Sequence, residues 1–333
     1  MVIIQKNMNA PSSEIIVVWG RNKINEKPNH GGNHLAHLVQ FGVPTTSLDI
    51  LPIKEEREWI ITHKQWTLAE YLKSWISTPR WVLISTPDEC HIADLRASIE
   101  AGVRVILVEK PIGLSADDYR EFQRLYALAK EQWQIIMSCL PRLTDTPYRH
   151  LTMGMSELIN LYGDVTEISH TFGFNKDVNK GFAGQDHIAH EITTVMQILW
   201  YTWKIEDIQI HITKSSADEY SCYWWIGGVH FTIGGNKKST VKYEQVTIKF
   251  KNGTAHLDAA NGKFAHSPNS WGQKFEYDAG KSNPVDRLTT VSRNFVEFAL
   301  GTEGVKLYLP DNSLAASAFF PSTLDWENLI AAS

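Results

Sequence analysis

The chain has 333 residues, of which 43% are hydrophobic and 21% are charged, and its formal net charge is -5. This length exceeds one ordinary hydrophobic core, so we expect two domains. The small negative charge indicates no nucleic-acid or membrane partner. The three cysteines form no Cys-x-x-Cys pair, and no apolar run reaches the roughly 18 residues that a membrane helix needs. We therefore expect a cytoplasmic protein whose partners are a small-molecule substrate and further copies of itself.

The first half of the chain alternates short apolar runs with helical patterns. The apolar runs predict buried strands over 14–19, 45–51, 81–85, 103–108 and 134–139. Apolar spacing and capping residues between them predict helices over 34–41, 67–75, 92–100 and 115–130. Strands that alternate with helices are typical of βαβ units. Residues 1–145 are therefore expected to form an α/β domain with a Rossmann-like, doubly wound parallel sheet.

The second half, residues 146–333, has a different pattern. After a helical stretch over 188–203, strand-like runs follow one another without helices, and they cover 208–214, 220–226, 230–233, 241–250 and 254–258. Asn252-Gly253 is typical of a hairpin turn. We expect an α+β domain with an open, mostly antiparallel sheet, whose free face serves subunit contacts. The last helix, 285–300, is expected to pack back towards the first domain.

Polar residues stand at the ends of two of the predicted parallel strands. Ligands bind at the carboxyl ends of strands in open parallel sheets, so we expect these residues to gather at one rim. Lys110 supplies a positive charge there that can polarise a substrate oxygen, although a strand-end salt bridge is the structural alternative. The rim residues of the two strands are Ser85, Thr86, Pro87 and His91, then Glu109, Lys110 and Pro111.

The turn after the first strand contains glycines but no Gly-x-Gly-x-x-Gly motif. A polar insertion separates Gly20, Arg21 and Asn22 from Gly31 and Gly32, which open the first helix. Glycines there allow a pyrophosphate to approach the backbone, while simple turn glycines are the alternative. Asp49 ends the second strand and can accept hydrogen bonds from a ribose, which favours NAD over NADP; a surface turn aspartate fits the spacing equally well.

Asp186 and His190 are four residues apart, so they share one face of the predicted helix. An imidazole with a carboxylate one turn away is suited to proton transfer in carbonyl and alcohol interconversion. A solvated, capped helix end is the structural alternative. Zinc is disfavoured because His187 and His190 are three apart and the sequence places no third ligand, so we expect no metal.

These motifs resemble the family of glucose-fructose oxidoreductase, inositol dehydrogenase and MocA. The similarity covers Thr-Pro, His, Ala-Gly and Glu-Lys-Pro between Ile84 and Pro111, followed by Asp186-x-x-x-His190. The resemblance implies NAD or NADP as cofactor, a dimer or tetramer formed through the second domain's sheet, and Lys110 as the active-site lysine. It also implies that His190 is the acid/base, with Asp186 as its partner or as a second substrate contact. The residues implied to line the cofactor are Thr86, Pro87, His91 and Glu109.

The expected activity is hydride transfer between a nicotinamide and a hydroxyl or keto carbon of a sugar, cyclitol or sugar nucleotide. One alternative keeps the fold and reduces an imine or conjugated double bond in natural-product or pigment metabolism. Another is a catalytically silent sensor or scaffold, because the glycine loop between Gly20 and Gly32 is interrupted. Ala189, in place of the family's usual glycine before the histidine, is a further departure.

Overall fold

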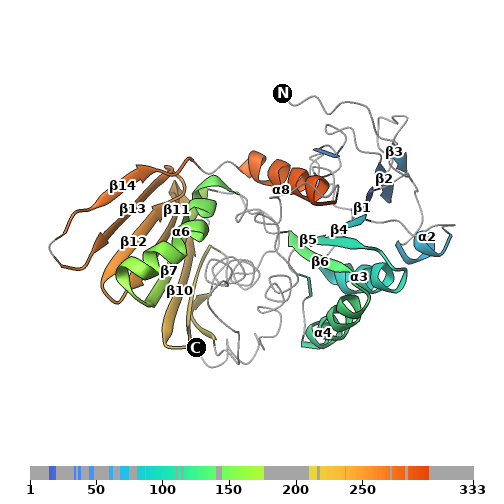
Figure 1. Ribbon diagram of the computed structural model, residues 1–333, viewed down its shortest axis with the longest axis horizontal. Coiled ribbons are helices and arrows are strands. Elements are labelled where there is room, and N and C mark those ends of the chain that lie inside the picture. Colours follow the sequence, from blue (N-terminus) through green and yellow to red (C-terminus); the bar gives the residue numbers. More distant parts are fainter. Residues whose placement is uncertain are drawn as a thin grey trace.

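A computed structural model describes the fold. The described residues are 15–19, 34, 37–38, 45–48, 60–62, 68–74, 81–86, 88–109, 112–113, 116–139, 145–175, 210–215, 218–236, 238–270, 272–281 and 284–299. They form two sheets, and helix α8 (Pro284–Ala299) lies between them (Figure 1). Within these residues, no helix combines the length and apolar character needed to cross a membrane.

Sheet A contains six strands in the order β3-β2-β1-β4-β5-β6, and every neighbouring pair is parallel. The parallel sheet expected for the first half of the chain is thus confirmed. The strand order reverses between β1 and β4, where Trp19 is in register with Ser85. Such a reversal opens a crevice at the carboxyl ends of the strands. The strands are β1 Ile15–Trp19, β2 Thr45–Leu48, β3 Ile60–Thr62, β4 Trp81–Ser85, β5 Val105–Glu109 and β6 Ile135–Cys139.

The centre of sheet A is hydrophobic, because β4 and β5 are buried at every position. Four further elements belong to this region: α2 Leu68–Ser74, η1 Asp88–Cys90, α3 His91–Glu100 and α4 Ala116–Glu131. One core cluster joins Ile84 and Val108 on the strands to Leu95 on α3 and Phe122 on α4. Each such side chain contributes about 1.5–3 kcal/mol when it is removed from water. Gly102, which follows α3, has a φ of +79° and provides the left-handed residue that commonly ends a helix.

Sheet B contains eight strands in the order β14-β13-β12-β11-β7-β10-β9-β8. All pairs are antiparallel except β7 with β10, so the mostly antiparallel sheet is confirmed. The predicted hairpin at Asn252-Gly253 joins β11 to β12. The strands are β7 Val165–Asn175, β8 Ile210–Ser215, β9 Glu219–Ile226, β10 Val229–Asn236, β11 Lys238–Phe250, β12 Gly253–Asp258, β13 Lys263–Pro268 and β14 Phe275–Asp278.

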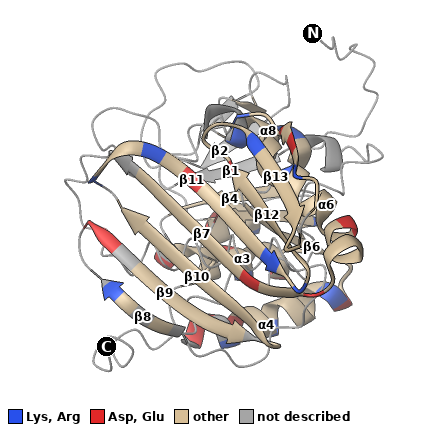
Figure 2. Ribbon diagram, turned by 90° about the vertical axis from the view of Figure 1, so that its left-hand side faces the viewer, with Lys and Arg blue, Asp and Glu red and all other residues tan. Residues whose placement is uncertain are grey.

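Helix α6 (Thr146–Tyr162) covers one face of sheet B. Its buried residues recur with helical spacing and pack with strand residues such as Ile168, Trp224 and Ile248. On β10 buried and half-buried residues alternate, which is the pattern of a sheet with one covered face. Figure 2 views sheet B in front of the elements of sheet A, and most residues along its strands are uncharged.

Candidate functional site

The end of β4 lies at the reversal of strand order in sheet A, and hydrogen bonds fix the turn that follows it. The Thr86 hydroxyl donates to Oδ2 of Asp94 at 2.7 Å. His91 is fully buried, and its Nε2 donates to the Thr86 carbonyl oxygen at 2.8 Å. Ser85 is also buried. The structure therefore brings together three residues predicted to line the cofactor, and their contact with a cofactor stays a prediction.

Asp94 on α3 is the carboxyl group that anchors this turn. Burial raises the pKa of Asp94, while the hydrogen bond from Thr86 and the proximity of His91 oppose that rise. The same residue's carbonyl accepts a hydrogen bond from the Ser98 hydroxyl at 2.8 Å. The turn after β4 is therefore held against the first turns of α3 by side chains as well as by the backbone.

A second group of polar residues lies at the ends of β5 and β6. We call His34, Glu109, Cys139 and Ser292 the rim cluster. His34 Nε2 lies 2.8 Å from Glu109 Oε1 and 3.7 Å from Cys139 Sγ. His34 Nδ1 lies 2.8 Å from the Ser292 hydroxyl oxygen, which belongs to α8. All four residues are buried.

The rim cluster was largely missed by sequence reasoning. Glu109 was predicted at the rim, but His34, Cys139 and Ser292 were not assigned to any site. One signal was present: Glu109 and Cys139 are the last residues of neighbouring apolar runs, and they are in register in the sheet. Ser292 gave no local signal, because only the folded chain brings α8 to this place.

Helix α8 makes a further contact beside the rim cluster. The Thr289 hydroxyl lies 3.0 Å from Nε2 of His37, which is one helical turn after His34. Burial and the neighbouring His34 lower the pKa of His37. Helix α8 is thus hydrogen-bonded to residues from the start of the chain at two successive histidines.

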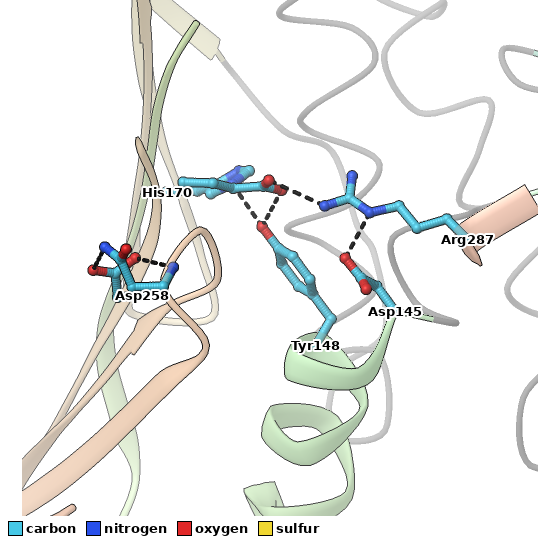
Figure 3. Close-up of polar contacts among 7 residues, drawn as sticks. Asp145, Tyr148, His170, Asp258 and Arg287 are labelled. Carbon is cyan, nitrogen blue, oxygen red and sulfur yellow. Dashed lines mark hydrogen bonds and ion pairs between the residues drawn. The ribbon is translucent and has the colours of Figure 1, made fainter. Parts of the chain in front are cut away.

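A buried polar network lies at the first turn of α8, against sheet B (Figure 3). We call Asp145, Tyr148, His170, Glu244 and Arg287 the arginine network. Arg287 donates from Nε to Asp145 at 2.6 Å and from a terminal nitrogen to Glu244 at 3.1 Å. The Tyr148 hydroxyl donates to Glu244 at 2.7 Å and lies 3.2 Å from Nε2 of His170. The network joins α8, α6, β7 and β11.

The charges within the arginine network are mutually compensating. Burial alone would lower the pKa of Arg287, but the carboxylates of Glu244 and Asp145 raise it above its ordinary value. The guanidinium therefore stays charged although its side chain is only 12% exposed. A buried cation held between two carboxylates is suited to stabilising one arrangement of the four elements, rather than to proton transfer.

The remaining predicted site residues lie outside the described residues. They include both groups of the expected catalytic pair, Lys110 and His190. Glu109, which precedes Lys110 in the chain, is described. The others are Gly20, Arg21, Asn22, Gly31, Gly32, Asp49, Pro87, Pro111 and Asp186.

Comparison with solved structures assigns the fold. An oxidoreductase from Agrobacterium radiobacter, in complex with NAD+, L-tartaric acid and magnesium, superposes with a TM-score of 0.71 at 12% identity, over 97% of this chain and 98% of that one. An inositol dehydrogenase homolog from Azotobacter vinelandii, complexed with NAD+, has a TM-score of 0.68 at 13% identity and 97% of both chains. The chain has the fold of these oxidoreductases.

A levoglucosan dehydrogenase in complex with NADH and levoglucosan shares the same fold. Its TM-score is 0.67 at 13% identity, over 96% of this chain and 98% of that chain. No protein-family model and no curated protein matches the sequence. The solved structures thus share the fold that the resemblance implied. The superposition covers nearly the whole chain, although the sequence identity is low.

Proposed function

We propose that this protein is an NAD(P)-dependent oxidoreductase of the glucose-fructose oxidoreductase, inositol dehydrogenase and MocA family. Its substrate would carry a hydroxyl or keto carbon on a sugar, cyclitol or sugar nucleotide. The main support for this proposal is the reversal of strand order between β1 and β4, together with the hydrogen-bonded turn at Thr86 beside it. Such a reversal is where dinucleotides bind in this type of sheet. The proposed domains are residues 1–145, a doubly wound dinucleotide-binding domain, and residues 146–333.

The proposal assigns the predicted cofactor residues to parts of a dinucleotide. In this proposal Ser85, Thr86, Pro87, His91, Glu109 and Pro111 line the nicotinamide end of the cofactor. Glycines and polar residues of the first turn hold the pyrophosphate, namely Gly20, Arg21, Asn22, Gly31 and Gly32. Asp49 accepts hydrogen bonds from the adenosine ribose, which favours NAD over NADP.

The bound nicotinamide supplies or accepts the hydride, and the protein positions the reacting carbon. Lys110 directly follows Glu109, the buried last residue of β5, in the chain. In the proposal it polarises the substrate oxygen, while His190 takes or gives the hydroxyl proton. Asp186, one helical turn before His190, orients the imidazole or contacts the substrate.

The test is to replace Lys110 and His190 by alanine and measure turnover with a panel of sugars and cyclitols. A general acid/base contributes about 10²–10⁴-fold, so kcat should fall at least a hundredfold in either variant. Lys130→Ala is the matched control, because Lys130 is an exposed lysine on α4. Normal turnover in folded Lys110→Ala and His190→Ala protein would refute the mechanism. Binding of NADH and NADPH can be measured by nicotinamide fluorescence. If neither binds, the silent sensor or scaffold is favoured.

We further propose that the free face of sheet B forms a homodimer or homotetramer contact. Trp225 is 52% exposed, and its ring stacks on His230 with 4.9 Å between ring centroids. Exposed stacked aromatic rings are typical of interfaces. Trp225→Glu should lower the mass measured by light scattering, whereas Trp133→Glu, on an exposed turn after α4, should not. An unchanged mass in Trp225→Glu would contradict the proposal.

A further inference from the structure

We propose that His34, Glu109 and Cys139 bind a divalent metal ion of the zinc class. This site would adjoin the proposed dinucleotide site, with Glu109 common to both, and it departs from the expectation, drawn from the sequence, of a metal-free protein. Within the described part of the chain, these are the residues whose His, Cys and carboxylate ligand atoms all lie within 4.8 Å of one another. All three are buried, and they come from three separate segments of the chain.

The donor set suits zinc. Imidazole nitrogen, thiolate sulfur and carboxylate oxygen are the three ligand types that zinc takes in proteins, and calcium or magnesium would select oxygen ligands instead. Three protein ligands leave a fourth tetrahedral position for water or another donor. The chemistry of the cluster therefore points to a borderline-soft divalent ion.

The distances already approach those of a tetrahedral site. With a Zn–N bond of about 2.05 Å and a Zn–S bond of about 2.3 Å, the nitrogen and sulfur ligands lie about 3.6 Å apart. The observed separation of His34 Nε2 and Cys139 Sγ is 3.7 Å. A nitrogen and an oxygen ligand lie about 3.3 Å apart, compared with 2.8 Å between His34 Nε2 and Glu109 Oε1. A shift of the Glu109 carboxylate by a few tenths of an ångström would make room for the ion.

The facing atoms of His34 and Glu109 need a proton or a metal ion between them. An imidazole nitrogen and a carboxylate oxygen at 2.8 Å cannot face each other with lone pairs alone, so a proton or a metal ion lies between them. One proton can bridge these two atoms but cannot also engage the thiol sulfur at the same nitrogen. A metal ion bonds to all three atoms at once and brings positive charge to a buried carboxylate.

The surroundings supply the support that a metal-bound histidine needs. Metal-ligating histidines donate the other ring N–H to an oxygen, which fixes the tautomer and the ring orientation. His34 Nδ1 has this contact, at 2.8 Å from the Ser292 hydroxyl oxygen. Burial of the cluster favours a structural ion that links the ends of β5 and β6 to His34. One of its ligands, Glu109, immediately precedes Lys110 in the chain.

The test is metal binding to the full-length protein after treatment with a chelator. Co²⁺ is added as a spectroscopic probe, since thiolate ligation gives a sulfur-to-cobalt charge-transfer band, and Zn²⁺ is measured by native mass spectrometry. The wild type should bind one ion per chain and show the band. Cys139→Ser should lose the band and bind at least tenfold more weakly. Cys90→Ser, at a half-buried cysteine outside the cluster, should match the wild type.

Glu109→Gln provides a second variant in case Cys139→Ser does not fold, as judged by circular dichroism. It should keep the thiolate band but bind at least tenfold more weakly, because a neutral amide is a poorer ligand than a carboxylate. The proposal is overturned if wild type binds neither ion, if the band persists in Cys139→Ser, or if Glu109→Gln binds as tightly as wild type. These readouts are independent of turnover and of nucleotide binding.

Discussion

Helix α8 joins two buried polar clusters that neutralise their carboxylates in different ways. In the arginine network, the permanent charge of Arg287 lies between Asp145 and Glu244. In the rim cluster, Glu109 faces an imidazole, whose charge depends on a proton or a bound ion. Among the described residues, the buried carboxylates paired with arginine hold structural elements together. A buried carboxylate paired with histidine and cysteine marks a place where an exchangeable cation can act.

The largest expected effect is at Arg287. Arg287→Met leaves two buried carboxylates without their cation, and breaking a buried pair in this way costs about 3–5 kcal/mol. Urea unfolding should report that loss in the free energy of unfolding. Arg124→Met, which removes an arginine with 56% side-chain exposure on α4, should change it by less than about 1 kcal/mol. Similar losses in both variants would show that the arginine network is not the stabilising feature we infer.

A smaller effect is expected at Tyr148. Tyr148→Phe removes the hydroxyl that donates to Glu244 and contacts His170, and an unsatisfied buried group costs about 1–3 kcal/mol. Thermal unfolding would measure the change. A double-mutant cycle with Glu244→Gln should show coupling, and additive losses would mean that the two side chains act independently.

Ser292→Ala tests the rim cluster alone, since Ser292 takes no part in the arginine network. The variant removes the oxygen beside His34 Nδ1, so we expect a loss of about 0.5–1.5 kcal/mol without metal. It should also weaken Zn²⁺ binding by about 10–100-fold, as loss of an outer partner typically does. Isothermal titration calorimetry would test this, and unchanged affinity would assign Ser292 to helix packing alone.

The smallest effect concerns Glu121 and its two arginine partners on the surface, which give a reference for the buried clusters. Hydrogen bonds from Arg124 and Arg96 lower the pKa of Glu121 to about 2, although desolvation opposes the shift. Because the folded-state pKa lies below the ordinary value, the stabilisation is present above about pH 4.5 and is lost as the pH falls towards 2. Solvent screening keeps it below about 1 kcal/mol. Unfolding curves of Glu121→Gln and wild type should converge at low pH; a constant difference would exclude titration of Glu121 as the cause.

Much of sheet A was predictable, because its strands are buried and read as continuous apolar runs. β4 and β5 match the predicted runs closely, and the end of each strand places Thr86 and Glu109 at the expected rim. The three-residue β3 was missed because it is too short to show a period. Strand order itself follows from packing between elements far apart in the sequence, which one chain's local pattern does not encode.

The missed elements of the second half have a different cause. Helix α6 was not predicted, although Asp145 precedes Pro147 at its first turn and apolar residues then recur at helical spacing. That signal was available in the sequence. β14 is exposed at all four positions, and β13 has one buried residue followed by half-buried ones, so hydrophobic periodicity could not find them.

The arginine network was beyond sequence reasoning. Asp145 and Arg287 are 142 residues apart, and neither lies in a motif. A lone arginine in an amphipathic helix is ordinarily solvated, and nothing local distinguishes Arg287 from Arg293 on the same helix. Only its 12% side-chain exposure in the folded chain identifies it as a buried charge.

The late position of α8 bears on how the chain matures on the ribosome. His34 emerges 258 residues before Ser292, and Asp145 emerges 142 residues before Arg287. Both contacts therefore wait until α8 has been synthesised, after both of their partner segments. A nascent chain that stops before residue 284 should therefore leave both polar clusters open to protease, and emergence of the chain through Ala299 from the ribosome should close them together.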